Sequence, residues 1–199
     1  MANVLLGVTG SVAAIYTPQL HDDLRQAGHA VKIVATKAAC YFFDAQAIAP
    51  QPDGTRNRDA VILDEDEWPG QRYRRDDPVL HIELRRWADV LLIAPLDGNT
   101  LGKLALGLTD NCLTCVYRAW DRSRPVILAP AMNTLMWEHP ATARHLRQIA
   151  EDLGPLLHIV PPVSKKLACD DVGVGAMATR EEIVASVNSM SARMARSER

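Results

Sequence analysis

Three short segments combine small and polar residues at points where buried strands are predicted to end. They are residues 9–11 (Thr-Gly-Ser), 97–100 (Asp-Gly-Asn-Thr) and 131–133 (Ala-Met-Asn). Gly10 and Ser11 would place backbone N–H groups and a hydroxyl at the start of the next helix, which suits a phosphate group. The spacing is neither G-x-G-x-x-G nor G-x-x-x-x-G-K-[ST], so dinucleotide binding and nucleotide hydrolysis are disfavoured. A plain turn with a serine cap is the competing interpretation.

Three more side chains could take part in chemistry, and each has an ordinary structural alternative. His81 lies beside an apolar helical stripe, where a lone histidine is more often a hydrogen-bonded core residue. Asn133 follows a predicted strand and could simply cap the next helix. Cys169 is an isolated thiol near Lys165 and Lys166, whose charges could favour the thiolate.

Two further patterns are weak evidence for a site. Cys112 and Cys115 form a C-x-x-C. A zinc site is disfavoured because no second pair of ligands has matching spacing. A thioredoxin-like redox pair is disfavoured because such a pair would open a helix just after a strand, whereas this one follows a predicted helix start. Two small buried thiols on a helix are the favoured interpretation, and we expect no metal. Residues 173–178 match G-x-G-x-x-A after a charged pair rather than after a strand, which favours a flap with glycine hinges.

The elements that position these residues alternate between apolar strands and helices. We predict strands at residues 3–8, 30–35, 90–94, 126–129 and about 157–160. Helices are predicted at 12–27, 38–48, 78–88, from 101, at 111–120, at 140–153 and from about 180. Strands that are apolar throughout indicate a parallel sheet covered on both faces. The predicted fold is therefore α/β, a doubly wound, Rossmann-like or flavodoxin-like sheet whose ligands bind at the carboxyl ends of the strands.

Length and composition limit the remaining possibilities. A chain of 199 residues predicts one domain, here residues 1–185 followed by a polar tail at 186–199, with residues 50–77 as an exposed excursion. The net charge of −2 gives no basic surface for nucleic acid. No apolar run is long enough to cross a membrane, and the N-terminus enters a strand pattern without a leader, so we expect a cytoplasmic protein.

Several segments together resemble the homo-oligomeric flavin-containing cysteine decarboxylases, and among them the enzymes that act on 4′-phosphopantothenoylcysteine. The matching text is GSVAA at 10–14, DEDEW at 64–68, DPVLHIELRRWAD at 77–89, NTLGK at 99–103, RAWD at 118–121 and APAMNTLMW at 129–137. The likeness runs from about residue 3 to residue 185.

The resemblance implies an FMN site at the tips of the sheet. In the family the flavin lies between subunits, commonly of a trimer, so a homo-oligomer (a trimer or a multiple of trimers) is expected. The cofactor-binding residues implied are Gly10, Ser11, Val12, Thr36, Ala38, Asp97, Gly98, Asn99, Thr100 and Ala131.

The resemblance also implies roles in catalysis. His81 would be the base, and Cys169 would donate the proton when the product is reduced. The substrate-binding residues implied are Asn133, Met136, Arg86, Lys166, Ala168 and Met177. The flavin would supply oxidation of the thiol carbon, so that a C=S group accepts the electrons released with carbon dioxide. Two positions depart from the family pattern: Asp170 replaces a glycine and Asp97 replaces a serine.

These implications leave three functions open. The first is decarboxylation of 4′-phosphopantothenoylcysteine to 4′-phosphopantetheine in coenzyme A biosynthesis, which the presence of Cys169 favours. The second is decarboxylation of a C-terminal peptidyl-cysteine to an aminoenethiol during maturation of a ribosomal peptide natural product, which Asp170 favours. The third is a regulatory flavoprotein subunit without catalysis, which His81 disfavours because such a subunit could dispense with it.

Overall fold

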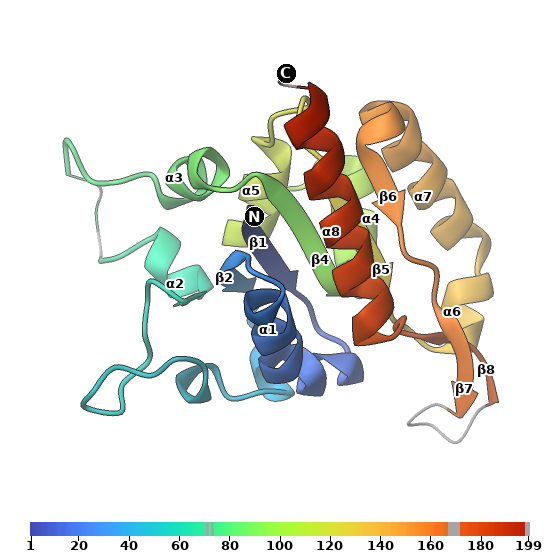
Figure 1. The fold of residues 1–199 in the computed structure, drawn as a ribbon, viewed down its shortest axis with the longest axis horizontal. Helices are drawn as coiled ribbons and strands as arrows, with labels where there is room; N and C mark the ends of the chain where they lie inside the picture. Colours follow the sequence, from blue (N-terminus) through green and yellow to red (C-terminus); the bar gives the residue numbers. More distant parts are fainter. Residues whose placement is uncertain (71, 73, 167–171, 198–199) are drawn as a thin grey trace.

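A parallel sheet of six strands forms the centre of the molecule, with the order β3-β2-β1-β4-β5-β6 (Figure 1). The computed structural model describes residues 1–70, 72, 74–166 and 172–197. The strands are β1 (Asn3–Val8), β2 (Ala30–Ala35), β3 (Val61–Ile62), β4 (Val90–Leu96), β5 (Val126–Pro130) and β6 (Leu157–Ile159). Strand β1 pairs with β2 on one side and β4 on the other. The strand order therefore reverses at β1, which is the point where open α/β sheets bind ligands.

Helices cover both faces of the sheet, which confirms the predicted doubly wound α/β fold. They are α1 (Thr17–Gln26), α2 (Asp64–Glu67), α3 (Leu80–Trp87), α4 (Gly98–Leu106), α5 (Cys112–Arg118), α6 (Thr134–Glu138), α7 (Pro140–Leu153) and α8 (Arg180–Ser197). Among the described residues, no helix combines the length and the apolar character needed to span a membrane.

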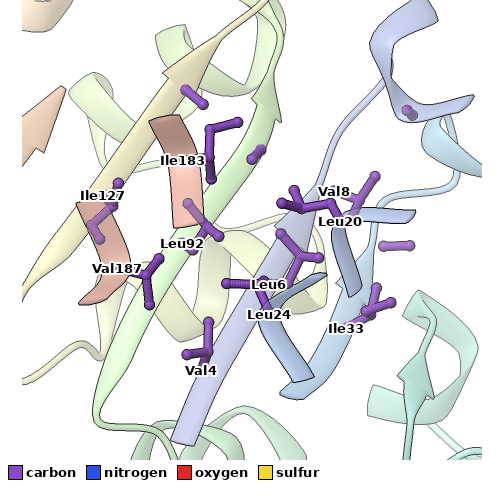
Figure 2. Packing of buried hydrophobic residues seen from close by; sticks show 14 of the residues in the cluster. Val4, Leu6, Val8, Leu20, Leu24, Ile33, Leu92, Ile127, Ile183 and Val187 are labelled. Atoms are coloured by element: carbon purple, nitrogen blue, oxygen red, sulfur yellow. The ribbon is translucent and has the colours of Figure 1, made fainter. Parts of the chain in front are cut away.

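The core has two parts because alternate residues of each strand point to opposite faces of the sheet. Val4, Leu6 and Val8 of β1 pack with α1 and α8 on one face, as Figure 2 shows. Leu5 packs on the other face with residues of α3, α4, α5 and α7, such as Leu113.

Two predicted helices differ from the observed structure. The segment 12–27 starts as a 3-10 helix at Val12–Tyr16 and becomes α-helical only at Thr17, next to a proline in the first turn. The predicted helix 38–48 is wrong, because this segment contains only short 3-10 turns at Ala39–Tyr41 and Ala45–Ala47. Asp44 separates the two turns: its backbone is extended and its side chain accepts the Gln46 N–H, a local bond that competes with a continuous helix.

The excursion at 50–77 contributes to the sheet at its edge. Strand β3 has only two residues, too few to give a periodic signal, and it pairs in parallel with Ile33 and Val34 of β2. Helix α2 follows at once and directs a buried acidic side chain toward α3, as described below.

Most of the segment predicted as a polar tail is helical. Helix α8 continues to Ser197, so the polar tail expected from residue 186 begins inside a helix that packs on the sheet. Val187 and Met190 are buried at 0% and 6% exposure. Residues three positions apart lie on the same face of a helix, so Val187 and Met190 both face the core. The many polar residues around them made this apolar face difficult to recognise from the sequence.

Most of the segment expected to form a glycine flap, residues 173–178, belongs to strand β8 (Val172–Ala176), which pairs in antiparallel fashion with β7 (Val163–Lys166). Strand β8 lies against the segment after β5, and the Met132 N–H donates to the Gly175 carbonyl over 2.9 Å. A Cβ atom on Gly175 would lie 2.2 Å from the Met132 carbonyl oxygen, and one on Gly173 would lie 2.5 Å from Oγ1 of Thr134. The glycines thus let β8 approach the backbone closely.

The first prediction concerns the C-terminal half of α8. Met190→Ala should lower the free energy of unfolding by about 2–5 kcal/mol, since it leaves a cavity in a packed core. The control Ser189→Ala changes an exposed neighbour on the same helix and should alter it by less than about 0.5 kcal/mol. Denaturant titration of both variants measures the difference. Equal effects would mean that α8 does not pack as described.

The second prediction concerns the contact between β8 and the Met132 backbone. Gly175→Ala should separate the two segments, because its new methyl group has no room beside the carbonyl oxygen. Hydrogen exchange at the Met132 amide should then accelerate. In Gly102→Ala, the new Cβ would meet nothing nearer than 3.5 Å, and this helical control should be neutral or stabilised by up to about 1 kcal/mol. Unchanged Met132 exchange in the first variant would contradict the close approach.

Candidate functional site

The carboxyl ends of β1 and β4 are joined by the hydroxyl group of Thr9. Its Oγ1 donates to the Pro95 carbonyl over 2.8 Å and accepts the Asp97 backbone N–H over 2.7 Å. Thr9 is fully buried. This bridge fixes the loop after β1 against the loop after β4 at the point where the strand order reverses.

A third loop reaches the same place. A Cβ atom on Gly10 would lie 2.7 Å from Cβ of Ala38, which follows β2, and 3.3 Å from Oδ2 of Asp97. Gly10 is therefore the residue that lets three strand ends meet. Most of the residues predicted to bind the flavin lie on these three loops: Gly10, Ser11, Val12, Thr36, Ala38, Asp97, Gly98, Asn99 and Thr100.

Asp97 is the N-cap of α4. Its Oδ1 accepts the Thr100 N–H over 2.8 Å, and Thr100 is buried beneath it. A negative side chain at a helix N-terminus is stabilised by the unpaired N–H groups and the helix dipole. This cap keeps a carboxylate next to the loop after β1, which we call the first loop.

A cavity of about 650 Å³ opens beside these loops. It lies between the first loop, the segment after β5, strand β8 and the start of α8. Five of the predicted site residues line it, and they are Ser11, Val12, Ala131, Asn133 and Met177. Much of the remaining wall is apolar and includes Ile15 and Met132, so the cavity suits a ligand with an apolar part.

Ser11 and Asn133 cap helices as well as lining the cavity. Oγ of Ser11 accepts the Ala13 N–H over 3.4 Å, and Oδ1 of Asn133 accepts the Leu135 N–H over 2.9 Å at the start of α6. The prediction that these two residues cap helices is thus confirmed. Both side chains also line the cavity, so the capping role is compatible with a role in binding. Met136, on α6, brings its methyl group to 3.0 Å from the Cβ position of Gly98.

His81 does not line this cavity. It lies on α3, and about a quarter of its side chain (24%) is exposed. Its Nδ1 is 2.5 Å from Oε1 of Glu67, and its backbone N–H donates to Oε2 of Glu67 over 2.9 Å. The hydrogen-bonded histidine that the sequence favours is therefore present, but its partner is an acid.

Glu67 is the residue that sequence reasoning missed. Its carboxylate is almost fully buried, with 4% of the side chain exposed, although it sits in a run of four acidic residues that looks like a solvated surface. The only signal was its place in the DEDEW segment of the resemblance, to which no role was attached.

The C-x-x-C differs from the expectation in two respects, because Cys112 is the first residue of α5 and Cys115 is only partly buried. Cys112 is buried and its Sγ lies 3.7 Å from Oε2 of Glu67. Burial, followed by the Glu67 carboxylate, raises the pKa of the Cys112 thiol far above its usual range, and the same two causes raise the pKa of Cys115. Both thiols are therefore protonated at neutral pH. No group of acidic, histidine and cysteine side chains that could hold a metal ion occurs in the described part of the chain.

The remaining predicted residues are dispersed. Arg86 is exposed on α3 and Lys166 is the last residue of β7. Ala168 and Cys169 lie outside the described residues, as does Asp170, so their predicted roles stay predictions.

Comparison with known proteins identifies the family. A model named Flavoprotein matches residues 1–191. The phosphopantothenoylcysteine decarboxylase of Mus musculus is 50% identical over 188 residues, which cover 94% of this chain and 86% of the relative. A solved structure of a PPC decarboxylase mutant complexed with pantothenoylaminoethenethiol has a TM-score of 0.81 and 48% identity, and covers 94% of this chain and 96% of its own. The FMN binding protein AtHal3 has a TM-score of 0.77 and 48% identity over 94% and 95% of the two chains. The chain belongs to the flavoprotein family.

Proposed function

We propose that this protein is an FMN-dependent cysteine decarboxylase whose substrate is 4′-phosphopantothenoylcysteine. The observation that carries the proposal is the cavity at the carboxyl ends of the sheet, lined by Ser11, Ala131 and Asn133. A chain that is half identical to a phosphopantothenoylcysteine decarboxylase supports the choice of reaction and substrate.

The residues present fit FMN in size and in chemical character. The cavity of about 650 Å³ lies within the usual range of cofactor sites. Gly10 has no side chain, so the loop after β1 approaches Ala38 closely, and in this region the hydroxyls of Ser11 and Thr36 would hold a phosphate. Val12 and Ala131 would lie against the flavin ring. Asp97 is the exception, since its charge disfavours a nearby phosphate.

The chain's own residues then have separate tasks. The bound flavin supplies oxidation of the thiol carbon. His81 takes the proton of the substrate thiol, whose pKa of about 8.5 leaves it mostly neutral at pH 7 without a base. The side-chain amide of Asn133 donates a hydrogen bond that orients the carboxylate to be lost. The resemblance assigns substrate binding to Met136, Arg86, Lys166, Ala168 and Met177, and it assigns to Cys169 the proton that accompanies reduction of the product.

We further propose that the working enzyme is a homo-oligomer, a trimer or a multiple of trimers. Within one chain His81 lies away from the cavity, so a single copy does not bring the base to the carboxylate-binding residue. Exposed apolar side chains flank both places: Ile15 and Tyr16 at the cavity, Trp68 and Val79 next to Glu67 and His81. Contact between copies would bury these side chains and bring the two halves together. The cytoplasmic location stays a prediction of the sequence.

The third prediction tests the reaction. The purified, flavin-loaded protein should convert 4′-phosphopantothenoylcysteine to a product that has lost carbon dioxide alone, if Cys169 donates the proton that accompanies return of the hydride from the reduced flavin. A peptide ending in cysteine should be unchanged. Mass spectrometry of both incubations separates this product from an enethiol, which lacks two more hydrogens. Exclusive turnover of the peptide would transfer the function to peptide maturation, and turnover of neither would reject the decarboxylase.

The fourth prediction concerns Asp97. Asp97→Asn keeps an oxygen that can cap α4 but removes the negative charge beside Gly10. We expect FMN to bind several-fold more tightly, because its phosphate no longer meets a like charge. Riboflavin, which lacks the phosphate, is the matched control and should bind equally to both proteins in a flavin fluorescence titration. An equal gain for both ligands would place the phosphate elsewhere.

A further inference from the structure

We propose that Glu67 is the positioning residue of His81, and that it sets which ring nitrogen accepts the substrate proton. The inference deepens the proposed function and rests on it, since His81 is the base there. It arises from a contact between two residues 14 positions apart in the chain.

The contacts of Glu67 assign one tautomer to His81. Oε2 of Glu67 accepts the His81 backbone N–H and the Cys112 thiol, and with the carboxylate as acceptor the Nδ1 atom, 2.5 Å from Oε1, carries the hydrogen. In a neutral imidazole the lone pair then belongs to Nε2. The base is thereby prepared before substrate binds.

The same carboxylate also fixes where the ring lies. Oε2 of Glu67 accepts the backbone N–H of His81 over 2.9 Å, in the first turn of α3, where a helix has no partner of its own for such a group. The cap residue Val79 has no side-chain acceptor to offer. Glu67 therefore holds both the main chain and the imidazole of His81.

Glu67 is itself held by the elements around it. Arg56 pairs with Asp66 through two bonds of 2.5 and 3.0 Å, which ties α2 to the preceding loop. Oδ1 of Asp64 accepts the Cys112 N–H over 3.1 Å at the start of α5. The Cys112 thiol lies against Glu67 as a third donor. A buried carboxylate is unfavourable unless its oxygens are satisfied, and here they are, which is the arrangement of a fixed orienting group.

The charged groups near the pair do not offer His81 a competing partner among the described contacts. Asp64 is engaged by the Cys112 N–H, and burial raises its pKa. Asp66 is engaged by Arg56. Glu65 has 68% of its side chain exposed and lies 4.0 Å from Arg56.

The test uses the flavin-loaded enzyme and the isosteric variant Glu67→Gln. We expect kcat to fall by roughly 100-fold or more, which is the usual contribution of a general base. KM should stay within about twofold, since substrate contacts are unchanged. Nitrogen-15 NMR of histidine-labelled protein should show the Nδ1–H form of His81 in the parent and a loss of that preference in the variant. The His81→Asn spectrum assigns the signal.

A matched control distinguishes an effect on the orientation of His81 from a general effect on folding. Glu65→Gln makes the same chemical change on the same helix at an exposed site and should leave kcat and the His81 spectrum unaltered. Glu67→Asp keeps the charge but loses reach, and it should recover part of kcat if the defect of Glu67→Gln is electrostatic. Flavin content and melting temperature of each variant report whether it folds.

The outcomes are distinct. A Glu67→Gln variant that folds and keeps the parent's His81 spectrum overturns the inference, whatever its activity. Altered NMR with unchanged kcat overturns it as well, because orientation then has no bearing on the reaction. If the parent decarboxylates neither substrate, the proposed function fails, while the spectra still show whether Glu67 sets the tautomer.

Discussion

The position of the site depends on how closely the loops at the carboxyl edge of the sheet can approach one another. The buried Thr9 hydroxyl holds two of these loops together, and the missing side chain of Gly10 admits the third. Strand β8 repeats the device on the opposite wall, where Gly175 touches the backbone of Met132. In both places a glycine lets two segments approach more closely than a side chain would allow, and Gly175 and Met132 line the cavity.

Several residues in this region stabilise the fold and line the site at the same time. Ser11, Asp97 and Asn133 each cap a helix with a side-chain oxygen. Parallel sheets place helix starts directly after strand ends, so a polar residue at that point is both a natural cap and a natural ligand contact. Structural and functional interpretations of such residues are therefore compatible, and finding the cap does not reduce the case for binding.

The sequence predicts what depends on local pattern. The apolar strands identify the sheet, and their polar ends identify Ser11, Ala131 and Asn133 as neighbours of a cavity. Sequence-based prediction fails where contacts between residues distant in the chain determine the structure. The turns around Asp44 result from one side-chain bond, α8 extends because Val187 and Met190 find the core, and the burial of Glu67 depends on α3 and α5 packing over it. The turns around Asp44 and the burial of Glu67 leave no periodic signal in the chain, and the helical spacing of Ile183, Val187 and Met190 lies among many polar residues.

The bond between Glu67 and His81 also closes a loop of the residues between them. Because the entropy of closing a flexible loop rises only slowly with its length, insertions or deletions in this stretch change the stability of the closure little. The segment is thus a place where the protein can acquire new sequence, for example to recognise a different substrate or partner, without displacing the imidazole.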